Sequence, residues 1–190
     1  MRFLSAILIF LFLGCGYRPV STMTQNLIGD SVFVEVIISR IDPQNTVIMK
    51  DSIREAAIKR LNKDLSDKQN ADTIITASIG SLSFTGLSSD IYGYTTAYKV
   101  NLVVDYKVVF KDKSVRNIST VGDYDFSVSN LIQGTKYTDS VISDTDRYNA
   151  IKNAAEQSFD EFISKLAVYG ARDGKYNQWS NQRSNQRSDV

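Results

Sequence analysis

The stretch AYKVNLVVDYKVVF, residues 97–110, decides the fold, because an apolar side chain occupies every second position along it. The alternating set is Tyr98, Val100, Leu102, Val104, Tyr106, Val108 and Phe110. Since successive side chains of a strand point to opposite faces of its sheet, this run predicts one buried face and one solvated face. It is also much longer than a usual strand of about five or six residues. We therefore expect a long central strand, part of which projects beyond the elements that cover the sheet.

The flanking segments predict further strands. KDKS at 111–114 separates the central run from a second alternating run at 115–128, a pattern typical of an antiparallel hairpin. Upstream, DTIITASIGSLSF at 72–84 and SVFVEVIIS at 31–39 have the β-branched composition of strands. We expect a single, largely antiparallel, four-stranded sheet.

Two other segments have a helical period. From Thr46 to Leu65, apolar residues recur at three- and four-residue spacing, and the same holds from Ser143 to Tyr169, after which Gly170 predicts a helix end. The element order is then strand, helix, three strands, helix. This order predicts the α+β class, with the sheet packed against two long helices that lie on one of its faces.

The N-terminus contains LFLGCGYRP, residues 11–19, with the only cysteine of the chain, Cys15. The positive Arg2 and the apolar run at 3–13 are typical of a signal-peptide core, which is too short to span a bilayer. Together with Gly14 before the cysteine, this segment resembles a bacterial lipobox. The resemblance implies a diacylglycerol on the Cys15 sulfur and cleavage before it. A buried or a reactive free thiol would require this segment to remain in the mature fold, which the signal-peptide pattern disfavours.

These signals divide the chain into four parts. Residues 1–14 are predicted to be a lipoprotein signal peptide, 15–30 a lipid-bearing tether and 31–169 the α+β sandwich domain. Residues 170–190 are polar and repeat NQRS, which predicts a disordered tail. Gly16 after the cysteine favours the outer membrane, on its periplasmic face, as the location.

The composition argues against several function classes. There is no histidine, and an acylated Cys15 would leave no free thiol, so Ser-His and Cys-His catalysis and His/Cys zinc sites are excluded. With 22 basic and 21 acidic residues, the chain has no charge excess that would attract nucleic acid. We expect no enzyme activity, no cofactor and no metal site. Asp144 and Asp146 are interpreted as helix-capping residues, and Asp123 and Asp125 as part of a solvated strand.

The cations of the predicted long hairpin are candidate contact residues. They are Lys99, Lys107, Lys111, Lys113 and Arg116. They could form an ordinary solvated face, because Asp105 and Asp112 are interspersed among them, or a patch that binds phosphorylated lipid or a protein partner. Both interpretations stay open at this point.

From about Cys15 to Leu166, the chain resembles the lipopolysaccharide-assembly lipoprotein family, LptE. The resemblance rests on GCGYRP at 14–19, the strand beginning TAYKVNLVVDYKV at 96–108 with its hairpin partner, and the closing helix AIKNAAEQSFDEFISKL at 150–166. It implies a non-enzymatic lipoprotein that binds and plugs an outer-membrane β-barrel, assists its assembly, and contacts lipopolysaccharide. Two alternatives remain: another envelope adaptor, such as an activator of a cell-wall synthase, or a lipid-anchored hydrolase.

Overall fold

The computed structural model describes residues 27–39, 43–61, 63–128 and 142–187, with side chains up to residue 172. Its elements are β1 (Ser31–Val36), α3 (Pro43–Leu61), β2 (Asp64–Leu65), β3 (Thr73–Ser89), β4 (Thr95–Val109), β5 (Val115–Ser127) and α4 (Asp144–Arg187). Cys15 lies outside the described residues.

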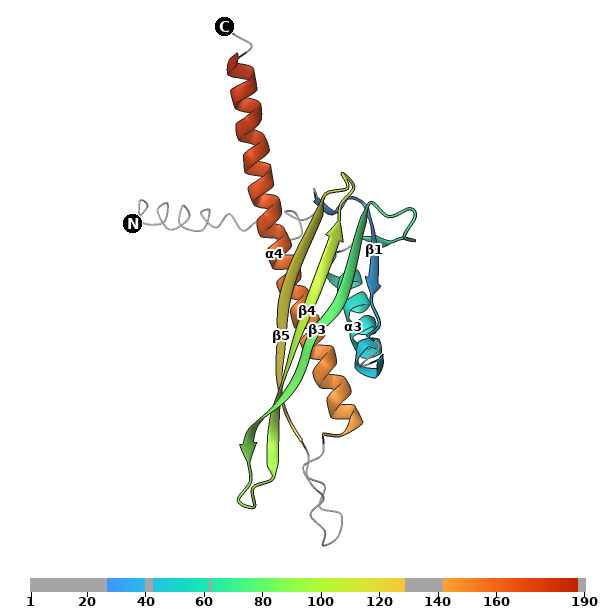
Figure 1. The fold of residues 1–190 in the computed structure, drawn as a ribbon, viewed down its shortest axis with the longest axis vertical. Coiled ribbons are helices and arrows are strands. Elements are labelled where there is room, and N and C mark those ends of the chain that lie inside the picture. Colours follow the sequence, from blue (N-terminus) through green and yellow to red (C-terminus); the bar gives the residue numbers. More distant parts are fainter. Residues whose placement is uncertain (1–26, 40–42, 62, 129–141, 188–190) are drawn as a thin grey trace, which may run out of the picture.

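The sheet has five strands in the order β2-β1-β3-β4-β5, and α3 and α4 pack against it (Figure 1). The predicted α+β class is confirmed. The prediction of four strands missed β2, whose two residues pair in parallel with Ser31 and Val32. Leu65 therefore belongs to a strand, and α3 ends before it. The three long strands are antiparallel, whereas β1 is parallel to β3 because α3 carries the chain back to the same end of the sheet.

The alternation along β4 produces the core. Val100, Leu102, Val104 and Val108 are fully buried, and they join residues of both helices in one cluster. The Tyr106 ring stacks on Phe162 with 4.4 Å between centroids. Burial raises the pKa of the Tyr106 hydroxyl. Tyr106 is therefore a neutral phenol in the folded protein.

The buried hydroxyls next to this ring satisfy one another. The Tyr106 hydroxyl lies 3.4 Å from Ser158 Oγ, which in turn lies 2.7 Å from Thr120 Oγ1. Buried polar groups destabilise a fold when they are unpaired. Because these three hydroxyls pair with one another, α4, β4 and β5 can share an apolar core that contains them.

Helix α4 approaches β5 very closely at a glycine. A Cβ atom added at Gly122 would lie 1.8 Å from the backbone oxygen of Ala154. Ala150, Ala154 and Ala155 of α4 are all fully buried. Only small side chains at this crossing allow the helix to rest on the strand.

Side chains of α4 also close the free edge of β5. The backbone N–H of Val121 donates to Glu161 Oε2 at 2.7 Å, and that of Asp123 donates to Gln157 Oε1 at 3.0 Å. Lys165 Nζ donates to the carbonyl oxygen of Ser119 at 2.8 Å. These bonds occupy groups that would otherwise be free to pair with another strand.

The β3–β4 hairpin extends beyond the lower end of α4 (Figure 1). Strand β3 runs to Ser89, five residues beyond the predicted end at Phe84, and its register with β4 shifts at Gly86 and Ser88. At the tip, Asp90 Oδ1 accepts the N–H groups of Tyr92 and Tyr94. The projecting part of the central strand is thus half of a hairpin, with a tip braced by an aspartate.

Helix α4 begins as expected and ends later than expected. Ser143 Oγ accepts the N–H of Asp146 at 3.1 Å and donates to its carboxylate at 2.7 Å, so Ser143 caps the helix, and Asp144 and Asp146 lie in its first turn. The helix does not stop at Gly170 but continues through Arg187, where we predicted a disordered tail. Gly170 does not adopt a positive φ. Without a left-handed cap or a proline, the Ala-, Arg-, Lys- and Gln-containing sequence that follows sustains the helix.

We predict that Gly122→Ala destabilises the protein by about 3 kcal/mol, because the methyl group would overlap the backbone of α4 at Ala154. The measurement is the free energy of unfolding in urea. Gly80→Ala is the matched control: its Cβ would mainly meet the carboxylate end of Asp105, at 2.9 Å, which is free to move. Equal losses for the two variants would show that the crossing is not tight.

Candidate functional site

The five candidate cations do not form one patch. Lys99 lies on the solvated face of β4, and its Nζ pairs with Asp123 at 3.2 Å and with Asp125 at 3.5 Å. The hydrogen bond to Asp123, together with the charge of Asp125, raises the pKa of Lys99. Lys99 is therefore neutralised within the sheet, and the two aspartates act as its partners.

Lys107 is exposed on the same face, in register with Thr76 of β3 and Asn117 of β5. Within the described residues no ion pair is recorded for it. It stands apart from the hairpin turn, so it fits the interpretation of an ordinary solvated lysine.

The other three cations lie at or beside the β4–β5 turn. The Phe110 N–H donates to the Ser114 carbonyl at 3.0 Å, and the Lys113 N–H donates to the Phe110 carbonyl at 2.8 Å. Lys113 has a φ of 62°, the left-handed conformation that usually belongs to glycine in such hairpins. A lysine in this conformation costs about 1–2 kcal/mol relative to glycine. The turn thus presents a cation at a strained position.

Asp112 stabilises this turn from within. Its Oδ1 accepts the Ser114 hydroxyl at 2.6 Å and the Ser114 N–H at 2.9 Å, and these bonds lower the pKa of Asp112. The carboxylate therefore serves the turn, although it sits between two lysines in the sequence.

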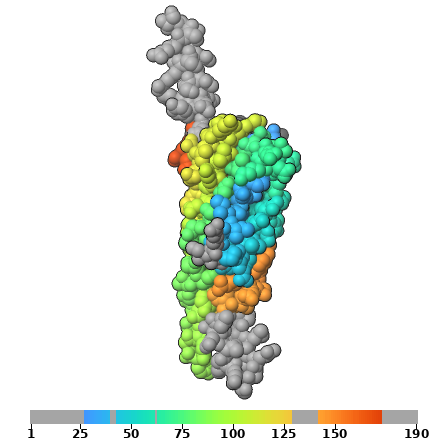
Figure 2. Space-filling view, turned by 45° about the vertical axis from the view of Figure 1, so that its right-hand side comes forward, coloured from blue at the N-terminus to red at the C-terminus, as the bar shows by residue number. Residues whose placement is uncertain are grey.

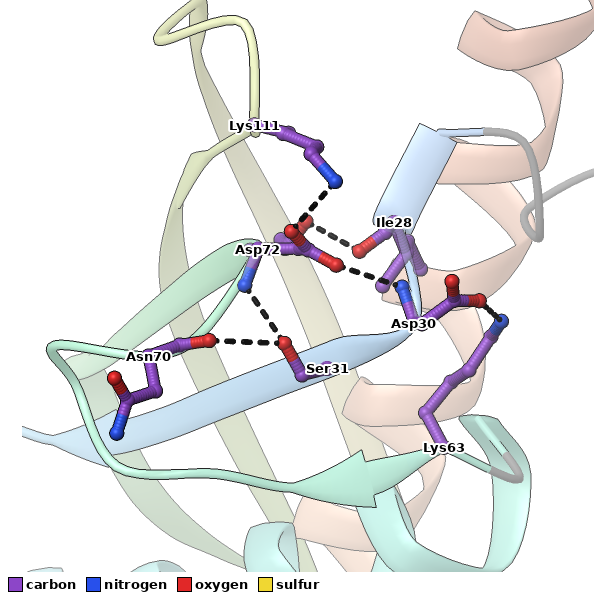
Figure 3. A network of polar contacts seen from close by, with 8 residues as sticks. Ile28, Asp30, Ser31, Lys63, Asn70, Asp72 and Lys111 are labelled. Carbon is purple, nitrogen blue, oxygen red and sulfur yellow. Dashed lines mark hydrogen bonds and ion pairs between the residues drawn. The ribbon is translucent and has the colours of Figure 1, made fainter.

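Lys111 joins the turn to the start of β1 through Asp72 (Figure 3). Lys111 Nζ lies 3.0 Å from Asp72 Oδ1, and Asp72 Oδ2 accepts the Asp30 N–H at 3.0 Å. The Asp72 N–H also donates to Ser31, whose hydroxyl donates to the Asn70 carbonyl. The hydrogen bond from Lys111, followed by that from Asp30, lowers the pKa of Asp72. We call Asp30, Ser31, Asn70, Asp72 and Lys111 the junction network.

Gly29 makes the junction network possible. Its φ is +70°, and an added Cβ would lie 2.6 Å from the Cβ of Asp72. Any other residue would push Asp72 away from Lys111 and Asp30. A glycine within the predicted tether therefore leaves room for the Asp72 side chain, which binds Lys111 of the β4–β5 turn.

A cleft of about 210 Å³ lies beside the turn. We call it the hairpin cleft. Its lining combines apolar and charged side chains: Leu27, Phe110, Lys111, Asp112, Ser114, Arg116 and Tyr169. Arg116 and Lys111 provide cations, of which Lys111 is also paired with Asp72, and Asp112 is the one acidic residue of the lining. Leu27, Phe110 and Tyr169 provide apolar contact. Such a lining suits an anionic molecule with an apolar part.

The structure brings together residues that the sequence did not group. Lys111 and Arg116 were predicted as contacts, whereas Leu27 was assigned to the tether and Tyr169 to the end of a core helix. Tyr169 is 39% exposed, so it faces the cleft more than the core. The helical period of α4 placed Tyr169 on the same face of the helix as the core residues. No sequence signal showed that the β4–β5 turn ends beside it.

Neither a cluster of metal ligands nor a membrane-spanning helix is found in the described residues. Among them, no group of three or more acidic or cysteine side chains is placed to bind a metal ion. Within the same residues, no helix has the length and hydropathy to cross a membrane.

Comparison with known proteins points to one family. The family model LptE, described as lipopolysaccharide-assembly, matches residues 33–166. A search of curated protein sequences finds no match to this chain.

Several solved structures are similar in fold. A putative lipoprotein from Caulobacter crescentus has 9% identity and a TM-score of 0.46, covering 80% of this chain and 96% of its own. Rare lipoprotein B from Shewanella oneidensis has 14% identity and a TM-score of 0.48, with coverages of 75% and 97%. A minor lipoprotein from Acinetobacter baumannii has 7% identity and a TM-score of 0.44, with coverages of 75% and 94%.

We predict that Lys113→Gly stabilises the protein by about 1 kcal/mol, because glycine adopts the positive φ of this position without steric cost. The readout is the urea midpoint at constant m-value. Lys113→Ala is the control, since it removes the charge but keeps the strain, and it should give no gain. A gain of equal size for alanine would assign the effect to charge.

We predict that Lys111→Gln raises the pKa of Asp72 towards its ordinary value, while the Asp30 N–H keeps it partly lowered. An acid with a lowered folded-state pKa stabilises the fold above its unfolded pKa of about 4, and this stabilisation is lost as the pH falls through the folded-state value. Carboxyl-carbon NMR titration measures the shift. Lys113→Gln is the control and should leave the Asp72 titration unchanged; an unchanged titration in Lys111→Gln would contradict the junction network.

Proposed function

Because this chain belongs to the lipopolysaccharide-assembly family LptE, we propose that it is a lipid-anchored, non-catalytic lipoprotein of the outer membrane that works in lipopolysaccharide assembly. In this proposal it faces the periplasm, binds and plugs a β-barrel partner, assists the assembly of that barrel, and helps to insert lipopolysaccharide at the cell surface. The observation that carries the proposal is the family match over residues 33–166, which runs from β1 through every later strand into the buried part of α4.

The hairpin cleft is the lipid contact in this proposal. Lipopolysaccharide carries phosphate groups next to acyl chains, so a site for it needs cations beside apolar surface. Lys111 and Arg116 supply the cations, and Phe110 and Tyr169 supply the apolar surface. Lys113 lies on the same turn and adds a third cation. Lys99 is not part of this proposed contact because it does not line the cleft and pairs with Asp123 and Asp125 on the solvated face of β4.

The segment between the proposed anchor and the cleft is short enough to hold the cleft near the membrane. Leu27, the first described residue, lines the cleft. The segment from the proposed anchor at Cys15 to Leu27 spans at most about 40 Å when fully extended. A lipid on Cys15 would therefore keep the cleft within about 40 Å of the periplasmic leaflet of the outer membrane.

The experiment is purification of the tagged, full-length protein from its native envelope in mild detergent, for the wild type and for a Lys111→Gln, Arg116→Gln double variant. We expect an outer-membrane β-barrel to co-purify in stoichiometric amount with both proteins. We expect the co-purified lipopolysaccharide to fall about tenfold with the double variant, because two charge-assisted contacts are lost. Quantitative mass spectrometry measures the barrel, and phosphate and fatty-acid assays measure the lipid.

Lys59→Gln is the matched control, because Lys59 is an exposed cation of α3 that pairs with Glu55, outside the cleft. Recovery of a cell-wall synthase in place of a barrel would replace this proposal with the adaptor alternative. Recovery of the protein alone, with a hydrolytic activity abolished by one serine or aspartate substitution, would replace it with the hydrolase alternative. Unchanged lipopolysaccharide in the double variant would move the lipid contact away from the hairpin cleft.

A further inference from the structure

The two edges of the sheet are treated differently. At β5, Glu161, Gln157 and Lys165 of α4 bond to the backbone along the edge. At the opposite edge, β2 covers only Ser31 and Val32 of β1. Beyond Val32, no described residue pairs with this side of β1.

The backbone groups left open can be identified from the alternation of a strand. The Val32 carbonyl faces β2, because it accepts the Ser66 N–H at 2.9 Å, whereas the Ile37 N–H faces β3, because it donates to Ala77 at 2.8 Å. Residues an even number apart from Val32 direct their backbone groups to the same side. The N–H and C=O groups of Val34 and Val36 are therefore directed at the open edge.

These groups lie in a groove and not on a flat surface. Val34 and Val36 are only 7% and 6% exposed. A groove of about 390 Å³ runs along them, between α3 and the segment that follows β2. In the space-filling view, β1 reaches the surface in blue beside α3 in cyan (Figure 2). Backbone groups so little exposed gain more from a hydrogen-bonded partner than groups in open water.

The charges that face the groove favour an acidic occupant on the helix side. Lys50 and Arg54 of α3 line it, and no ion pair is recorded for either within the described residues. The acidic residues of the lining are Glu35, which pairs with Lys68 at 2.8 Å, and Asp67. The unpaired cations are thus both on α3.

The solvated side of the same edge carries two apolar side chains, Phe33 and Ile37, with Glu35 between them. Glu35 is already paired with Lys68, which also lies 5.8 Å from the centre of the Phe33 ring. Phe33 lines the groove, and Ile37, which follows β1, is 54% exposed. A strand placed next to β1 would direct alternate side chains to these two sides, one set to Lys50 and Arg54 and the other to Phe33 and Ile37.

We propose that the open edge of β1 binds an extended segment of another polypeptide, in which acidic and apolar side chains alternate, as an additional strand of the sheet. The segment bonds to the backbone of Val34 and Val36, places its acidic side chains next to Lys50 and Arg54, and packs its apolar ones beside Phe33 and Ile37. This contact goes beyond the proposed function: it is made to a protein segment, on the sheet edge opposite the one that α4 closes, and it needs no lipopolysaccharide.

The test is binding of a labelled heptapeptide of alternating Glu and Val to the purified full-length protein in detergent, without lipopolysaccharide. We expect the bound peptide to slow hydrogen exchange at the Val34 and Val36 amides. Exchange at the Asp123 amide, on the closed edge, should not change. The same peptide with N-methyl groups on the residues that face β1 should bind at least about tenfold more weakly, because it lacks the donors of the ladder. A peptide of alternating Lys and Val should also bind at least about tenfold more weakly.

The charge contact is tested with a Lys50→Gln, Arg54→Gln double variant, and Lys59→Gln on the same helix is the control. The double variant should lose about tenfold in affinity for the Glu peptide and the control should lose none. Exchange at β4 amides checks that each variant is folded. Equal binding of the N-methylated peptide, or protection that spares Val34 and Val36, would overturn the proposal. Because the proposed function is tested by barrel and lipid recovery, either can fail without the other.

Discussion

The contact of α4 with β4 and β5 is the constraint on which the other features depend. The buried face of β4 needs an apolar cover along Leu102, Val104 and Tyr106, and α4 supplies it through residues such as Phe159, Phe162 and Leu166. The helix comes so close at Gly122 that the backbone of Ala154 is in contact with the strand. This short distance is also what lets Glu161, Gln157 and Lys165 reach the edge of β5. One packing contact therefore both builds the core and closes an edge.

The asymmetry of the sheet follows from this contact. Helix α4 lies over β5 and does not reach the edge at β1. Helix α3 covers the face of β1, and within the described residues the outer backbone groups of Val34 and Val36 stay open. The short β2 blocks only the first two residues of that edge. An open edge promotes aggregation unless something controls it. In the proposed strand contact, the recess and the cations Lys50 and Arg54 would restrict which strands pair with it, by charge and by shape.

The sequence was most informative where one physical rule acts alone. Period-two alternation identified β4, and helical spacing identified α4 through Leu166, because burial on one face determines both patterns. The LptE resemblance, based on element order, is confirmed by the family match. Two helix ends were predicted wrongly. Leu65 pairs with β1 instead of extending α3, which is a tertiary effect, and α4 passes Gly170, because a glycine alone does not end a helix when it does not adopt a left-handed conformation. Of the five candidate cations, Lys99 could not be assigned from sequence, because its pairing with Asp123 and Asp125 depends on the β4–β5 register.

The residues that line the hairpin cleft could not be grouped from the sequence. Leu27, Tyr169 and the pair Phe110 and Arg116 come from three separate parts of the chain, and they meet only because the β4–β5 turn ends where the chain enters β1. Asp72 holds that meeting point together, since it binds Lys111 of the turn and the backbone of Asp30 at once. Lys111 of the cleft is thus bonded to the start of β1 through a single carboxylate. Because Gly29 lacks a Cβ and so leaves room for that carboxylate, the position of Lys111 depends on a backbone conformation outside the hairpin.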